Sequence, residues 1–307
     1  MSASGSPVMI VGSVALDSVR TPFGEVTEEL GGAAVYSAVA ASYFAPVQLV
    51  GVVGTDFPEE HVSFLASRNI DLRGLQRAEG PTFRWAGEYE YDVNKRRTLK
   101  TELNVFECFR PNIPDPYRDA QYVFLANIDP CLQMEVLSQV RNPKLIMCDT
   151  MNFWIESKRD ALLEVLKRVD VVFMNDEEVR QLYDTPSIVK AAHEVRNLGP
   201  SVVVIKKGEH GALMITDGAH FSAPSYPCEE VVDPTGAGDT FAGGFIGYVA
   251  STDDYSEANL RKAVIYGSAL ASFCVEDFSL RRLARLTIPQ IAERYCEFKN
   301  MSFFEPI

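Results

Sequence analysis

The stretch DPTGAGDTFAGGF, residues 233–245, combines a Gly-Ala-Gly turn with an apolar run that is interrupted by further glycines. The turn, Gly236-Ala237-Gly238, is built of small residues, so several backbone N–H groups can converge on one anion. The apolar run is typical of a buried helix, whose dipole adds positive potential at its first turn. Asp239 stands in that first turn, where a carboxylate serves either as a helix cap or as a catalytic base.

Two other phosphate-binding motifs do not fit this turn. A P-loop requires a Gly-Lys dipeptide, which the chain does not contain. The dinucleotide-binding fingerprint requires a third glycine where Phe241 stands, and it belongs after the first strand of a domain. What remains is an anion-binding turn that can stabilise a transferring phosphoryl group, with Asp239 placed to accept a proton from the attacking hydroxyl.

The composition narrows the class of protein. A chain of 307 residues that is 47% hydrophobic has ample material for one large domain. Its formal net charge of −13, with no long basic block, argues against a nucleic-acid partner. The 6 cysteines form no C-x-x-C pair, which indicates reduced thiols in a cytoplasmic protein rather than a zinc site. We expect no membrane span and no signal peptide, because no apolar run reaches about 18 residues.

Short apolar runs alternate with helical patterns along most of the chain. This alternation predicts an α/β domain with a mostly parallel sheet. The predicted strands are residues 9–14, 47–53, 122–126, 145–148, 171–174 and 202–206. The predicted helices are residues 33–43, 59–68, 135–139, 158–168, 177–182, 188–198, 240–250, 257–273 and 289–298.

Residues 82–106 interrupt the alternation and predict an antiparallel hairpin. Phe83, Trp85, Tyr89 and Tyr91 share one face at period two, and a second alternating arm follows over residues 99–105. The turn is expected over residues 92–97. The aromatic face of this hairpin must cover the body of the protein, a second subunit or a bound ligand.

The signature around the turn is similar to that of a known family. It comprises Asp233, Thr235, Gly236, Gly238, Asp239, Thr240, Gly243 and Gly244, and it closely resembles the C-terminal motif of the ribokinase-like (PfkB) family of carbohydrate kinases. Further segments resemble that family in the expected order: GSVALD (12–17), GGAAVYSAVA (31–40), GVVGTDF (51–57), NDEE (175–178) and KKGEHGA (206–212). The resemblance therefore covers nearly the whole chain.

The resemblance implies a fold and an activity. The fold is a doubly wound, mostly parallel sheet flanked by helices, as one domain over residues 1–307. A small β-sheet lid is formed mainly by about residues 14–30 and 82–106. The activity is transfer of the γ-phosphoryl group of ATP to a hydroxyl of a sugar or related polyol, with Asp239 as base and Gly236, Ala237 and Gly238 as the anion hole.

The resemblance also implies binding residues. The substrate-side residues are Asp17, Gly31, Gly32, Tyr36 and Asp239, and the ATP-side residues are Asn175, Lys206, Gly208, Gly211, Thr235, Gly236 and Gly238. Glu178 is implied to hold Mg²⁺ through water, since Mg²⁺ usually keeps several waters. Taken alone, Asn175 and Glu178 also fit an ordinary helix start. Asp233 is implied to hold a monovalent cation such as K⁺, and the lid is implied to form a homodimer.

Departures from the family pattern bear on the acceptor. Tyr36 stands where relatives acting on simple sugars usually carry asparagine, and DTMNFW (149–154) replaces an Asp-x-Asn-x-Arg motif. Without that arginine a sugar phosphate is a poor acceptor candidate. An aromatic ring at position 36 would suit a nucleobase, so a nucleoside is the alternative to a free sugar. A ligand-binding sensor without catalysis is the alternative from another class.

Overall fold

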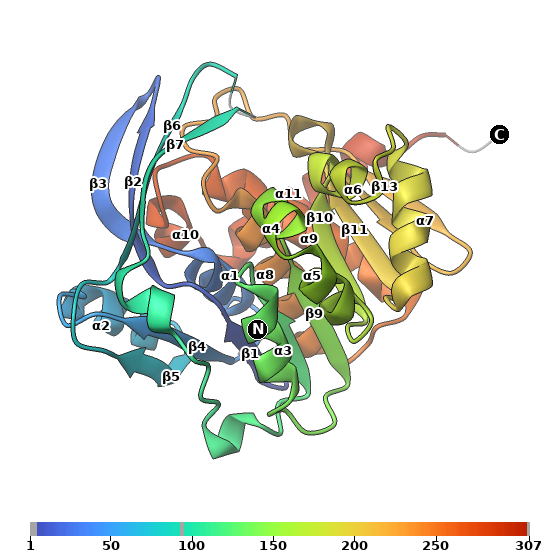
Figure 1. The fold of residues 1–307 in the computed structure, drawn as a ribbon. Helices are drawn as coiled ribbons and strands as arrows, with labels where there is room; N and C mark the ends of the chain where they lie inside the picture. Colours follow the sequence, from blue (N-terminus) through green and yellow to red (C-terminus); the bar gives the residue numbers. More distant parts are fainter. Residues whose placement is uncertain (1–4, 93–94, 306–307) are drawn as a thin grey trace.

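A nine-stranded sheet runs through the centre of the protein in the computed structural model, which describes residues 5–92 and 95–305 (Figure 1). Its strand order is β13-β12-β11-β10-β9-β8-β1-β4-β5, and all neighbours pair in parallel except β11–β12 and β12–β13. The strands are β1 (Val8–Val11), β4 (Val47–Val53), β5 (Ile70–Arg77), β8 (Tyr122–Leu125), β9 (Leu145–Asp149), β10 (Val171–Asn175), β11 (Val202–Lys206), β12 (Ala212–Ile215) and β13 (His220–Ala223).

Helices cover both faces of this sheet, and each face has its own apolar core. Alternate strand residues contribute to opposite cores: Val8 and Ile10 to one, Met9 and Val11 to the other. Buried residues of one core come from α1 (Ala33–Ala41), α2 (Glu59–Ser67), α8 (Ala237–Thr252), α9 (Glu257–Cys274), α10 (Arg281–Arg285) and α11 (Ile288–Ser302). Those of the other come from α3 (Pro130–Leu137), α4 (Asn152–Ser157), α5 (Arg159–Leu166), α6 (Asp176–Tyr183) and α7 (Ile188–Leu198). Burial on both faces explains why the strands read as continuous apolar runs.

A separate four-stranded sheet, which we call the lid sheet, stands at the left of Figure 1. Its order is β3-β2-β6-β7, formed by β2 (Ala15–Thr21), β3 (Gly24–Gly31), β6 (Phe83–Tyr89) and β7 (Arg96–Glu102). Trp85 and Tyr89 on its inner face pack against a small cluster of Val19, Val26 and Phe278. The α/β architecture with a second, smaller sheet confirms the predicted fold class.

The outer face of the lid sheet carries charged pairs. Glu88 pairs with Arg20 and Arg97, and Arg84 pairs with Glu28 and Asp56. A dimer formed through this face would therefore bring charged side chains into the interface instead of burying apolar ones. Within the described residues, no helix combines the length and the apolar character needed to cross a membrane.

The bounds predicted for the second arm of the hairpin, residues 99–105, were wrong. The strand β7 ends at Glu102, and a 3₁₀ turn, η1 (Asn104–Cys108), follows because Asn104 adopts a left-handed backbone with φ 51°. A register shift between Ala86 and Gly87 moves the alternation of β7 by one residue. Tyr91, expected on the aromatic face, is 88% exposed beyond β6. Residues 93 and 94 of the predicted turn lie outside the described residues.

The helix predicted at 135–139 begins and ends earlier in the structure. It is α3, which begins at Pro130 because the Asp129 side chain accepts a hydrogen bond from the Cys131 N–H and proline suits the first helical position. The helices α4 and α10 and the strands β5, β12 and β13 were not among the predicted elements, whereas β2 and β3 lie at about residues 14–30, which the family resemblance implied for the lid. β5 is half-buried, so it lacks the continuous apolar run of the central strands.

Candidate active site

The Gly-Ala-Gly turn forms the start of α8, and Gly236 is its N-cap residue with φ 75°. A Cβ on Gly236 would lie 2.4 Å from the ring of Tyr36, which packs against the turn. Glycine is therefore required both for the left-handed backbone and for the close approach of the ring. Gly238 is not among the left-handed glycines, and a Cβ there would lie 3.1 Å from the Lys206 Nζ.

Asp239 lies at the third position of α8, so the helix is capped by Gly236 and not by this carboxylate. The Asp239 carbonyl oxygen accepts a hydrogen bond from the Ser37 Oγ at 3.0 Å, which ties this first turn to α1. Burial raises the pKa of the Asp239 carboxyl to about 7, with a further contribution from Asp149, while Lys206 and Arg96 oppose the shift. A carboxylate with this pKa is suited to accept a proton near neutral pH.

The carboxyl ends of three neighbouring parallel strands supply the polar groups facing this turn. Asp149, Asn175 and Lys206 are the last residues of β9, β10 and β11. Asn175 and Lys206 are register partners, and the Lys206 Nζ lies 2.5 Å from the Asp149 Oδ2. This is the sheet edge where open α/β sheets bind ligands.

Asp149 and Lys206 form a buried ion pair, with side-chain exposures of 3% and 17%. Burial opposes the charge of Lys206, but Asp149 and Glu178 outweigh it and raise the lysine pKa. Lys206 therefore stays protonated beside Gly238. The sequence analysis did not include Asp149 among the site residues. Its position directly after a predicted parallel strand is a signal that could have identified it.

Asn175 and Glu178 form a reciprocal capping box at the start of α6. The Glu178 Oε2 accepts from the Asn175 N–H at 2.7 Å, and the Asn175 Oδ1 accepts from the Glu178 N–H at 2.7 Å. Burial, with help from Asp149, raises the pKa of Glu178 to about 8. Glu178 is thus a helix cap in this structure, and its carboxylate also belongs to the buried acidic group around Lys206.

The acceptor-side residues meet where the lid sheet joins α1. Asp17 lies on β2, and a Cβ on Gly31 would lie 2.0 Å from its Oδ2. Gly32 has φ 96°, and a Cβ there would lie 2.5 Å from the Ser13 carbonyl oxygen. Burial raises the pKa of Asp17 to about 7, opposed by the Gly32 backbone and reinforced by Asp233 and Asp239. The two glycines therefore let the chain pass directly beneath Asp17.

Tyr36 is 1% exposed, and its ring lies against Gly236. Its buried hydroxyl has no hydrogen-bond partner within the described residues. The ring packs against Gly236 and is buried, so it has no exposed face on which a base could stack. On the lid sheet, the Tyr89 hydroxyl contacts Thr235, and Trp85 is the register partner of Asp17.

Thr235 links the site to the lid sheet. Its Oγ1 donates a hydrogen bond to the Tyr89 hydroxyl at 3.3 Å. On the far side of the site, Gly208 (φ 53°) and Gly211 (φ 79°) shape the turn between β11 and β12. A Cβ on Gly211 would lie 2.1 Å from the Ala223 carbonyl oxygen, so this turn passes close to β13.

Asp233 is buried and holds the segment that follows α9. Its Oδ1 accepts from the Thr235 N–H at 2.9 Å, and its Oδ2 accepts from the Ser279 N–H at 3.2 Å. The carbonyl oxygen of Val275 accepts from the Val232 N–H at 2.8 Å. Both Asp233 carboxylate oxygens therefore accept backbone hydrogen bonds, and the K⁺ ion expected at Asp233 stays a prediction.

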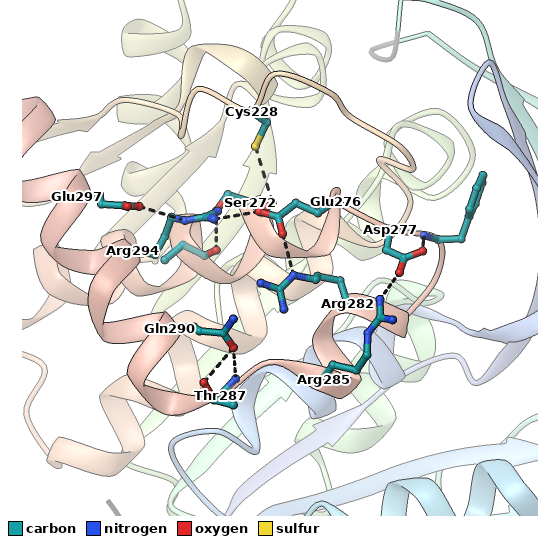
Figure 2. A network of polar contacts seen from close by, with 12 residues as sticks. Cys228, Ser272, Glu276, Asp277, Arg282, Arg285, Thr287, Gln290, Arg294 and Glu297 are labelled. Carbon is teal, nitrogen blue, oxygen red and sulfur yellow. Dashed lines mark hydrogen bonds and ion pairs between the residues drawn. The ribbon is translucent and has the colours of Figure 1, made fainter.

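Two arginines hold Glu276, which belongs to the same segment after α9. Glu276 accepts hydrogen bonds from Arg282 at 2.8 Å and from Arg294 at 3.0 Å, and Figure 2 shows both arginines pointing toward it. The Arg294 guanidinium lies 3.8 Å from the ring centroids of both Tyr226 and Phe273. The segment 275–279, whose Ser279 N–H donates to Asp233, is thus held in place by the contacts of Glu276 with two arginines.

Comparisons with known proteins identify the family of the chain. The family described as pfkB family carbohydrate kinase matches residues 8–284. A cytidine kinase of Thermococcus kodakarensis is 33% identical over 245 residues, which are 78% of this chain and 87% of that protein.

Solved structures share the fold. The nucleoside kinase of Methanocaldococcus jannaschii superimposes with a TM-score of 0.76 at 22% identity, covering 96% of this chain and 100% of that chain. The ribokinase of Arabidopsis thaliana, complexed with ribose and ATP, superimposes with a TM-score of 0.74 at 21% identity, covering 95% of this chain and 99% of that chain.

Proposed function

The chain belongs to the pfkB family of carbohydrate kinases, and from this premise we propose that it transfers the γ-phosphoryl group of ATP to a hydroxyl of a nucleoside. Asp239 accepts the proton of that hydroxyl. The N–H groups of residues 236–238 and the ammonium of Lys206 stabilise the negative charge that develops on the transferring group. The lid sheet closes over the acceptor and excludes water from the reaction.

The donor is expected at the carboxyl ends of β10 and β11. Lys206, Gly208 and Gly211 follow one another along this edge, and Asn175 and Thr235 flank it. Asp149 raises the pKa of both Glu178 and Asp239, so a divalent cation near these buried carboxyls would offset their repulsion. Within the described residues no three carboxylate, histidine or cysteine side chains are grouped to bind a metal directly, which suits an Mg²⁺ ion held through water. The ion would neutralise the phosphate charge, and Glu178 would hold it through water.

Replacing Glu178 with glutamine is expected to raise the Mg²⁺ concentration needed for half-maximal rate. Glutamine at the third helical position still completes a capping box, so α6 is expected to stay folded. The measurement is initial rate against free Mg²⁺, with circular dichroism as the folding check. Glu177→Gln is the matched control, since Glu177 is exposed in the same helical turn. An unchanged Mg²⁺ dependence in Glu178→Gln would remove Glu178 from the metal site.

The observation that carries the nucleoside assignment is the position of Trp85. Asp17 and Trp85 are register partners on the parallel strands β2 and β6, so both side chains point to the inner face of the lid sheet. An acceptor whose hydroxyls meet Asp17 therefore has an indole ring beside it, which suits a base. The similarity to a cytidine kinase and a nucleoside kinase supports the same choice.

A substrate panel tests the acceptor. We expect at least one of cytidine, adenosine and inosine to have a higher kcat/KM than ribose or fructose. Stacking contributes roughly 1–3 kcal/mol per base, which corresponds to about 5–150-fold. Product identified by mass distinguishes turnover from binding. If every nucleoside is inert while a free sugar is phosphorylated efficiently, the acceptor is a sugar; binding without turnover would indicate a sensor.

Replacing Trp85 with alanine sharpens this test. The variant is expected to lose kcat/KM for the nucleoside by about 5–150-fold, as the loss of one stacked base predicts. Tyr91→Ala is the matched control, because Tyr91 belongs to the same hairpin and is 88% exposed. Equal losses in both variants would show a general effect on the hairpin rather than base contact.

A further inference from the structure

Arg96 and Arg97 are adjacent on β7, but they face opposite sides of the lid sheet. Arg97 is the register partner of Glu88, and its Nη1 lies 2.9 Å from the Glu88 Oε1 on the outer face. Arg96 is the register partner of Tyr89, whose hydroxyl contacts Thr235 at the catalytic turn. Because register partners on antiparallel strands point to the same face, Arg96 lies on the inner face, toward the site.

The surroundings of Arg96 leave its charge uncommitted. Its guanidinium carbon lies 5.6 Å from the centroid of the Trp85 ring. Across residues 5–92 and 95–305, no carboxylate forms an ion pair with Arg96, whereas Lys206 is already paired with Asp149. The positive charge of Arg96 also opposes the raised pKa values of Asp239 and Glu178. Arg96 is exposed and, among the residues that the structure describes, has no ion-pair partner, so its charge can bind an incoming anion.

We propose that Arg96 is a catalytic residue that the lid sheet brings to the transferring phosphoryl group. The proposal rests on the proposed function. The acceptor oxygen forms the new bond to γ-phosphorus, the bond to the bridging oxygen breaks with its electron pair leaving on ADP, and the hydroxyl proton goes to Asp239. Arg96 donates N–H hydrogen bonds to the phosphoryl oxygens through its planar fork, and no proton moves to or from it.

This role couples chemistry to closure of the lid sheet. Trp85, Tyr89 and Arg96 lie on one face, so the aromatic side chains that face the acceptor and the guanidinium move as one unit. The alternative is that Arg96 only supports the Trp85 ring through a cation–π contact. These roles differ in what they predict for phosphate analogues and for pH.

The first test compares Arg96→Ala with Arg97→Ala on whichever acceptor the wild-type enzyme phosphorylates. Arg96→Ala is expected to lower kcat by about 10³-fold, at the low end for arginines that stabilise phosphoryl transfer. KM for the acceptor should change by less than about threefold. Arg96→Lys and added guanidinium should each restore part of the activity. Arg97→Ala should keep nearly full turnover.

The second test measures binding instead of turnover. Arg96→Ala should bind ADP as the wild type does, but should bind ADP with aluminium fluoride and acceptor at least about tenfold more weakly. A supporting role at Trp85 would weaken acceptor binding and leave the phosphoryl analogue unaffected.

The third test is the pH profile. Removing the positive charge of Arg96 is expected to raise the pKa of Asp239, so the acidic limb of kcat/KM should move to higher pH. The charged or titratable groups that face Asp239 are Asp17 on β2, Arg96 on β7, Asp149 on β9, Lys206 on β11 and Cys274 on α9. Arg96→Ala removes only one of these groups, so a shift of the acidic limb would report the loss of its charge.

The outcomes separate the two proposals. A wild-type protein that phosphorylates a sugar but no nucleoside contradicts the acceptor assignment and still allows the test of Arg96. A wild-type protein that phosphorylates nothing overturns both. Arg96→Ala with more than half of wild-type turnover, or an equal loss in Arg97→Ala, overturns the role of Arg96 alone.

Discussion

Replacing Asp239 with asparagine is expected to lower kcat by about 10²–10⁴-fold, the usual contribution of a positioned general base. The fold should persist, because Gly236 occupies the N-cap position and the replaced group is a carboxylate whose charge burial disfavours. ATP binding should stay close to that of the wild type. The measurement is steady-state turnover together with thermal unfolding and nucleotide titration.

The pH dependence of the wild type provides a second readout on Asp239. Only the ionised carboxylate accepts a proton, and its pKa is raised to about 7. The kcat/KM value should therefore fall as pH decreases below about 7, and Asp239→Asn should lack this limb. Asp217→Asn is the control, since the Asp217 side chain is fully exposed. An Asp239→Asn variant with more than half of wild-type turnover would exclude Asp239 as the base.

Replacing Gly236 with alanine is expected to abolish most activity and to destabilise the fold. A non-glycine residue in the left-handed region costs about 1–2 kcal/mol, and displacing a packed ring costs about 1–3 kcal/mol more. The new Cβ would lie 2.4 Å from the buried Tyr36 ring, so the turn must shift and its N–H groups lose their convergence. We expect turnover to fall by at least about 10²-fold, as for loss of an oxyanion-type donor.

Urea unfolding and turnover check this prediction against matched variants. Gly218→Ala is the control for backbone strain alone, because Gly218 has φ 120° and a Cβ added there would meet no atom within 4 Å. Adding Tyr36→Leu to Gly236→Ala should recover part of the lost stability by relieving the clash. Gly238→Ala is expected to lower activity less than Gly236→Ala, since a Cβ on Gly238 would meet the flexible end of Lys206. Activity of Gly236→Ala within about twofold of the wild type would mean that the turn is only structural.

The central strands and the catalytic turn could be predicted from sequence because their signals are local. Continuous apolar runs mark strands buried on both faces, and the family signature around residues 233–244 is contiguous. The pfkB assignment and the α/β fold class are confirmed. Errors occurred where a local pattern was changed by its neighbours. The bulge in the lid sheet and the left-handed Asn104 shortened β7, and Asp129 moved the start of α3.

The sequence by itself determined the chemistry available to this protein: small residues at an anion-binding turn, a carboxylate behind it, and strands that end in polar groups. Only the tertiary structure decided which groups act on one another. Strand order brings Asp149 to Lys206 across residues that are far apart in the chain, and the register of β6 and β7 separates Arg96 from Arg97. The tertiary structure also packs the ring of Tyr36 against Gly236. The physical reason is that pKa values, ion pairs and close packing depend on distances across the fold, which packing sets and local sequence patterns do not encode.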